Sequence, residues 1–228
     1  MISVTSYCQW DARWGKRPLG TSGKTMATDG CMVTAITNAL NVYGHKYDPG
    51  TVCDILNADK GFNSEGLVIW QAVERNFRGT AFIDSLSIWT TNYDQFTSKV
   101  GVTEALRLLR NIVSLGMPVF LNVDNIGNDK RPDHFITLYH APLVGPWKAI
   151  DPDGGYEVLL ESGHKYGLKE TAIYGFRVLM GPTQSFPDYV NPQDHWQGLA
   201  AWKASMVYAG KDVKTYSKEI LDAFAQKV

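Results

Sequence analysis

Three residues that are far apart in the sequence are of the types that perform nucleophilic catalysis: Cys31, His134 and Asp151. Cys31 follows the turn-forming residues 28–30 and opens a run with apolar residues at helical spacing, which predicts a helix from about Cys31 to Tyr43. A thiol in the first turn of a helix faces unpaired backbone N–H groups and the positive end of the helix dipole, which stabilise a thiolate and can hold an oxyanion. In the alternative interpretation, Cys31 is a buried cysteine that packs as a small hydrophobic side chain.

His134 and Asp151 fall on two expected strands, residues 133–140 and 147–152, which are joined by a short turn. With Pro142 and Leu143 at the centre of the turn, His134 lies directly opposite Asp151 on one face of the sheet. The Cβ atoms of such a pair are only about 5 Å apart, so the carboxylate can hold one ring nitrogen and leave the other for a thiol. Alternatively, the two residues are unconnected residues at loop ends.

Two further polar residues bear on this chemistry. The side-chain amide of Gln9 can donate an N–H group to a tetrahedral intermediate, next to the backbone N–H of Cys31. The alternative for Gln9 is a structural or surface role. Asp29 places a carboxylate two residues before the thiol, where its charge opposes thiolate formation unless the side chain points away.

A set of short motifs is spread over roughly residues 4 to 158. In chain order they are Gln9-Trp10-Asp11-Ala12-Arg13-Trp14-Gly15, Leu19-Gly20, Gly30-Cys31, Tyr43-Gly44, Asp48-Pro49, Gly116-Met117-Pro118-Val119, His134-Phe135 and Asp151-Pro152. As an ordered set, these motifs resemble the C39-like cysteine peptidases, which belong to the papain-like superfamily.

The resemblance implies a role for four residues: Cys31 as the nucleophile, His134 as the general base and acid, Asp151 as the residue that orients the imidazole, and Gln9 as the oxyanion-hole amide. It also implies an α+β, papain-like fold. In that fold, the Cys31 helix packs on an antiparallel sheet that supplies His134 and Asp151, and the substrate cleft lies between the two halves.

The expected function is that of a cysteine-type peptidase, a thiol hydrolase that acts on a peptide or protein substrate. Two alternatives remain open. One is a hydrolase that cuts the peptide crosslinks of bacterial cell walls, as lytic enzymes of phages or bacteria do. The other is a papain-like binding or structural module without activity.

Composition narrows the classes of partner. With 228 residues, 44% hydrophobic and 20% charged, the chain is typical of a globular protein. A formal net charge of -1 without a basic block argues against nucleic acid as a partner. Residues 1–5 lack the features of a signal peptide, and no apolar run approaches the roughly 20 residues that span a bilayer. We therefore expect no membrane span and a place in the cytoplasm or in a virion.

The cysteines and histidines indicate neither a cofactor nor a metal. Cys8, Cys31 and Cys53 cannot all be paired and show no C-x-x-C spacing, which argues against a disulfide framework or a zinc site. The remaining histidines lack metal-ligand spacing. Cys53 falls in an expected short helix, where a core position is the simplest interpretation.

The other expected elements are helices at about 50–57, 64–78 and 103–115, and strands at 118–123, 156–160 and 171–180. Residues 1–181 would form the peptidase domain. The break at Gly181-Pro182 would lead into a C-terminal helical extension, residues 182–228, with two apolar stripes. These stripes must be buried against the main domain, a partner or a second copy, so oligomerisation through the extension stays open.

Overall fold

The computed structural model describes residues 4–77, 81–84, 106, 109–110, 112–114, 116–123, 133–161 and 173–180. Its helices are α1 (Met26–Asp29), α2 (Cys31–Val42), α3 (Pro49–Ala58) and α4 (Trp70–Asn76). Its strands are β1 (Ala81–Asp84), β2 (Val119–Val123), β3 (His134–His140), β4 (Trp147–Asp151), β5 (Tyr156–Leu160) and β6 (Ile173–Met180). The α+β class predicted from the sequence is confirmed.

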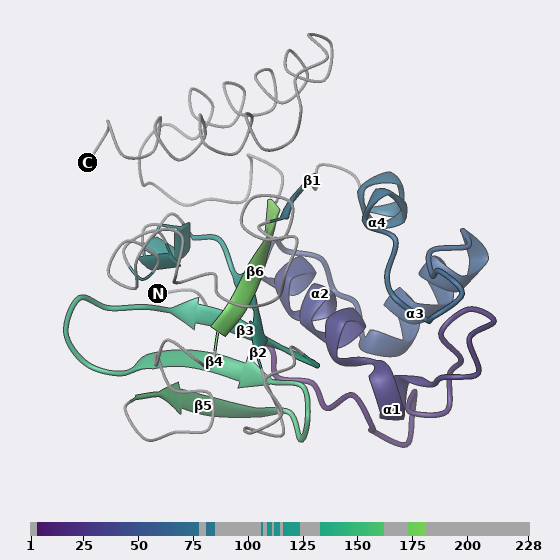
Figure 1. Ribbon diagram of the computed structural model, residues 1–228, viewed down its shortest axis with the longest axis horizontal. Coiled ribbons are helices and arrows are strands. Elements are labelled where there is room, and N and C mark those ends of the chain that lie inside the picture. The colour runs from purple at the N-terminus through teal and green to yellow at the C-terminus, as the bar shows by residue number, and fades with distance from the viewer. Residues whose placement is uncertain are drawn as a thin grey trace, which may run out of the picture.

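The strands form one antiparallel sheet in the order β1-β6-β2-β3-β4-β5. The last strand among the described residues, β6, is inserted between β1 and β2, so neighbours in the sheet come from distant parts of the sequence. In Figure 1, α1 to α4 lie on the right of the view, and β3, β4 and β5 lie on the left. The helical first half of the chain therefore packs beside a sheet built mostly from the second half.

Strand β2 separates two hydrophobic clusters, because successive side chains of a strand point to opposite faces. Val119, Leu121 and Val123 belong to a cluster with residues from β3, β4, β5 and β6. Phe120 belongs to the cluster built around α2 and α3. Burial on both faces explains why the run 118–123 is nearly continuous in apolar residues.

Helix α2 is buried on nearly all sides, since every residue from Cys31 to Leu40 is buried. It ends beside Gly44, whose positive φ of 86° suits the left-handed conformation after a helix end. Its observed bounds confirm the helix predicted from Cys31 to about Tyr43. The Tyr43 hydroxyl donates to the Leu179 carbonyl and joins the end of α2 to β6.

Most other predicted elements are also confirmed, but the helix predicted at 64–78 is wrong in its first half, because α4 begins only at Trp70. A turn replaces the missing part. The Asn63 side chain accepts hydrogen bonds from the N–H groups of Glu65 and Leu67, both at 2.9 Å, and Gly66 has a φ of 79°. This local side-chain bonding competes with helix formation. The described residues between 106 and 114 are helical, as predicted.

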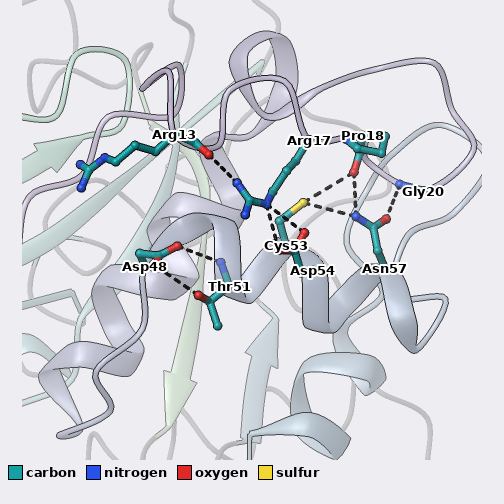
Figure 2. A network of polar contacts seen from close by, with 9 residues as sticks. All are labelled: Arg13, Arg17, Pro18, Gly20, Asp48, Thr51, Cys53, Asp54 and Asn57. Atoms are coloured by element: carbon teal, nitrogen blue, oxygen red, sulfur yellow. Dashed lines mark hydrogen bonds and ion pairs between the residues drawn. The ribbon is translucent and has the colours of Figure 1, made fainter.

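A polar network holds the segment before α1 against α3 (Figure 2). Arg17 forms an ion pair with Asp54 at 2.9 Å. The Asn57 amide donates to the Pro18 carbonyl at 2.8 Å, and its oxygen accepts from the Gly20 N–H at 2.9 Å. The segment then pairs with the start of α1, since the Met26 N–H donates to the Arg17 carbonyl at 2.9 Å. Helix α3 thereby fixes the approach to Cys31.

Cys53 also lies in this network and is a core residue, as predicted. Its burial raises the pKa of the Cys53 thiol to about 12. The predicted C-terminal helices, and with them the division at 181/182, lie outside the described residues. Within the part of the chain that is described, no helix combines the length and the apolar character needed to cross a membrane.

Candidate active site

The ends of three elements meet at one place. Cys31 is the first residue of α2, His134 the first of β3 and Asp151 the last of β4. Because β3 and β4 are antiparallel, the start of one and the end of the other lie at the same end of the sheet. Helix α2 packs against β3, and its first turn brings Cys31 to this end. All three sequence-predicted residues are therefore brought together.

His134 and Asp151 form a direct, buried hydrogen bond. The imidazole Nε2 lies 2.7 Å from Oδ1 of Asp151, and the two residues are 4% and 0% exposed. The same carboxylate oxygen accepts the backbone N–H of Asp153 at 2.9 Å. Since Nε2 is engaged, Nδ1 is the ring nitrogen left for a contact with Cys31.

The register that was predicted for this pair is wrong by two residues. Thr137 pairs with Ile150 and Leu138 with Ala149, and continuing this register places Asp151 opposite Ile136, two residues from His134. The cause is the connection, in which residues 141–146 replace a two-residue turn and an irregularity follows Leu138. A shift of two residues keeps the same face of the sheet, so the side chains meet diagonally.

The environment favours the charged form of His134. Burial by itself lowers the pKa of the imidazole, because the charged form loses its hydration. The interactions of the imidazole with Asp151 and with Cys31 act in the opposite direction and prevail. The pKa of His134 is raised from its ordinary 6.5 to about 10, so the imidazole carries a proton at neutral pH.

A break in the helix before Cys31 exposes backbone donors. The Gly30 N–H bonds the Met26 carbonyl at 2.9 Å, and the Thr34 N–H bonds the Gly30 carbonyl at 3.0 Å. Gly30 is both the C-cap of α1 and the N-cap of α2, and the N–H groups in the first turn of a helix have no partner within that helix. Only glycine fits at the break, because a Cβ on Gly30 would lie 2.3 Å from the Met26 carbonyl oxygen.

Gln9 joins the helix start to the loop after Asp151. Its backbone N–H donates to the Pro152 carbonyl at 2.9 Å, and its side-chain Nε2 donates to the Ala27 carbonyl at 3.2 Å. In an unbroken helix, the Ala27 carbonyl would accept the N–H of Cys31 instead. An amide nitrogen carries two hydrogens, so one remains for a ligand beside Cys31.

A close backbone contact fixes the segment that carries Gln9. Gly155, in the turn after β4, has a φ of 68°, and a Cβ there would lie 2.7 Å from the Cys8 nitrogen. Nearby, the Trp10 indole N–H donates to Asp153 at 3.1 Å. The amino-terminal segment and the turn that follows Asp151 therefore pack together without room for a side chain at Gly155.

The Asp29 carboxylate is compensated by a cation. Lys24 Nζ lies 2.8 Å from Asp29 Oδ1. This ion pair offsets the negative charge that would otherwise oppose thiolate formation at Cys31. In the described part of the chain, no group of three or more His, Cys, Asp or Glu side chains is placed to hold a metal ion.

A cavity of about 640 Å³ opens in front of this constellation, and Gln9, Cys31 and His134 all line it. Asp151 lies behind His134. The lining also includes two polar residues that the sequence analysis missed, Asn122 and Arg177. The one available signal was Asn122, a polar residue inside an otherwise apolar strand. The apolar lining consists of Met32, Val33, Leu67, Val68, Trp70 and Phe135, with Ala27 beside them.

Comparison of the chain with protein-family models, with curated proteins and with solved structures finds no match. The chemistry of the site therefore has to be argued from its own geometry.

Proposed function

We propose that this chain is a papain-like cysteine peptidase that hydrolyses peptide bonds with Cys31 as its nucleophile. The observation that carries the proposal is the position of His134, which is hydrogen-bonded to a buried Asp151 and lines the same open cavity as Cys31. A protonated imidazole next to a sulfur at a helix start is the arrangement that maintains a reactive thiolate.

In the proposed reaction, the Cys31 sulfur attacks the carbonyl carbon of the scissile bond. As the tetrahedral intermediate collapses, His134 gives its proton to the leaving amine, the C–N bond breaks, and an acyl-enzyme remains. The neutral imidazole then accepts a proton from water, whose oxygen attacks the thioester carbonyl. Release of the carboxylic acid regenerates the thiolate and the protonated imidazole.

The carbonyl oxygen needs donors while it carries negative charge. The Cys31 backbone N–H, in the first turn of α2, supplies one. The second hydrogen on Gln9 Nε2 supplies another, since the first is used to hold the side chain on Ala27. Fixed donors of this kind stabilise an oxyanion without reorganisation.

The first experiment replaces the sulfur. We expect Cys31→Ala to abolish hydrolysis while thermal melting stays close to that of the parent chain, and Cys8→Ala to retain activity as the matched control. The substrate panel contains unfolded proteins and bacterial cell walls. Clearing of walls without proteolysis would redirect the proposal to cell-wall peptides, and turnover by the Cys31→Ala chain would end it.

A second measurement separates an enzyme from an inactive module. Cys31 should react with iodoacetamide at neutral pH faster than Cys8, which is partly exposed, and faster than the buried Cys53. Peptide mapping by mass spectrometry gives the three rates separately. A Cys31 that alkylates no faster than the other two would favour a binding module that lacks thiol chemistry.

A further inference from the structure

The part of the cavity wall formed by β2, beside the start of β3, contains a buried polar side chain, that of Asn122. Asn122 is 3% exposed and lines the cavity, and no donor among the described residues bonds its Oδ1. A buried carbonyl oxygen without a donor is energetically unfavourable, because it has lost its hydration without gaining a hydrogen bond. Such an atom at the wall of a substrate cavity is suited to receive an N–H group of a ligand.

Arg177 lies on the neighbouring strand and lines the same cavity. It is 9% exposed, and its guanidinium carbon lies 4.5 Å from the centre of the Trp70 ring and 5.1 Å from that of Phe135. Contact with two rings restricts the movement of the guanidinium, and a planar fork of N–H donors matches the geometry of a carboxylate.

The register places these two groups near each other. Across the sheet, Asn122 of β2 pairs with Gly175 of β6 and with Phe135 of β3, and these three residues form one cross-strand row. Arg177 belongs to the next row on the same face, where it pairs with Phe120. Because its guanidinium contacts the Phe135 ring, the Arg177 side chain extends across β2 toward the row of Asn122. Gly175 has no side chain to block that path.

Acidic and basic side chains line different sides of the cavity. Asp133, next to His134, and Asp153, after β4, line the side formed by β3 and β4. Arg177 lines the side formed by β6. A negatively charged group of a ligand is therefore favoured at the β6 side of Cys31.

We infer that Asn122 and Arg177 form a substrate-binding subsite for a residue that carries a carboxylate: the Asn122 oxygen accepts its backbone N–H, and the Arg177 guanidinium holds its carboxylate. The carboxylate belongs either to the free C-terminus of a peptide or to a Glu or Asp side chain. This inference deepens the proposed function and rests on it for the identity of the ligand as a peptide.

The probes are bromoacetyl peptides, in which the Cys31 sulfur displaces bromide and forms a thioether. Bromoacetyl-Gly, -Gly-Gly and -Gly-Gly-Gly, each as free acid and as C-terminal amide, vary the distance between the sulfur and the carboxylate. Bromoacetyl-Gly-Glu-amide and bromoacetyl-Gly-Gln-amide test the side-chain source. The rate of modification of Cys31 is measured by mass spectrometry, with iodoacetamide as the reference reagent.

At one length or more, the acid should modify Cys31 about tenfold faster than its matched amide, since a charge-assisted bidentate contact is gained. Arg177→Gln should reduce that ratio to about one, and Arg177→Lys should keep part of it. Asn122→Ala should slow the acid and the amide alike, because it removes the contact with the shared N–H group. Arg75→Gln, which changes an arginine paired with Asp59 outside the cavity, should leave all rates unchanged.

Equal rates for acid and amide in every pair would overturn the subsite, as would a ratio that survives Arg177→Gln. A preference in the C-terminal pairs alone identifies a terminal carboxylate, and one in the Glu–Gln pair a side chain. Iodoacetamide rates that stay constant across the variants show that the site is intact.

Calorimetric titration of the Cys31→Ala chain with acetyl-Gly-Gly-Gly, as acid and as amide, measures the subsite without any reaction of the thiol. If the Cys31→Ala chain binds the acid more tightly than the amide, and Cys31 of the parent chain does not react with iodoacetamide, the subsite is retained and the peptidase function is rejected. A reactive Cys31 without any preference for the acid, in alkylation or in binding, would do the reverse.

Discussion

His134 and Asp151 share a hydrogen bond of 2.7 Å although neither lies directly opposite the other in the sheet. The carboxylate reaches the imidazole diagonally across β3 and β4, and the N–H of Asp153 holds it from the other side at 2.9 Å. The bond fixes Nε2 and leaves Nδ1 for Cys31. The turn after β4 thus helps to hold the carboxylate that orients the imidazole.

Replacing Asp151 separates the charge from the hydrogen bond. Asp151→Asn keeps an acceptor oxygen but removes the negative charge, so the pKa of His134 should fall and hydrolysis should slow by about tenfold or more. Asp151→Ala also leaves a buried ring N–H without its acceptor, which should destabilise the fold by about 1–3 kcal/mol more. NMR titration of His134 and urea unfolding measure the two effects. An unchanged pKa in Asp151→Asn would contradict the role of the charge.

The pKa of His134 also predicts how stability depends on pH. The pKa is raised from 6.5 to about 10 on folding, so the folded chain binds the proton more tightly than the unfolded chain. This stabilisation is complete below the unfolded value of 6.5 and is lost as the pH rises through about 10. Between these values, the free energy of unfolding should fall by at most about 1.4 kcal/mol per pH unit.

Urea unfolding at several pH values measures this slope, and the His134→Gln chain is the control, since it lacks the titrating group. The hydrolytic rate should decline over the same alkaline range, because the leaving amine loses its proton donor. A slope that is identical in the parent and in His134→Gln would show that another group is responsible.

The break at Gly30 predicts an effect of a single methyl group. Gly30→Ala places a Cβ 2.3 Å from the Met26 carbonyl oxygen, so the backbone before Cys31 must move. We expect a loss of about 1–3 kcal/mol in stability and slower alkylation of Cys31. Gly23→Ala is the matched control: its φ is 79° and nothing lies within 4 Å of the added atom, so it should carry backbone strain alone. Equal alkylation rates in both variants would contradict the argument.

The ion pair of Lys24 with Asp29 should support the reactivity of the thiol. Lys24→Gln leaves the Asp29 carboxylate uncompensated two residues from Cys31, and alkylation of Cys31 should slow by a few fold, about two to five, at low salt. The double change Lys24→Gln, Asp29→Asn removes both charges and should restore the rate. A double variant as slow as the single one would indicate that Lys24 acts through packing instead.

Local patterns in the sequence predicted most helices and strands correctly. The sequence did not predict the strand register at His134 or the position of Arg177, because both depend on contacts between distant segments. The periodicity after Cys31 and the glycine at 44 define α2, and β5 has the predicted bounds. The register of His134 failed because it depended on the assumed geometry of one turn. Arg177 could not be anticipated, since only the insertion of β6 beside β2 brings it to the cavity.

Substitutions of Gln9 distinguish two effects: stabilisation of the oxyanion intermediate and activation of the Cys31 thiol. Gln9→Ala removes a donor to the proposed oxyanion, so hydrolysis should slow by about 10²–10³. Alkylation by iodoacetamide forms no oxyanion, so its rate at Cys31 should change little. Gln9→Glu is the matched control, because it preserves size but replaces the donor with an acceptor and a negative charge, and its hydrolysis should be at least as slow. If hydrolysis and alkylation fall together in Gln9→Ala, Gln9 acts by holding the start of α2 through Ala27, and the oxyanion role is wrong.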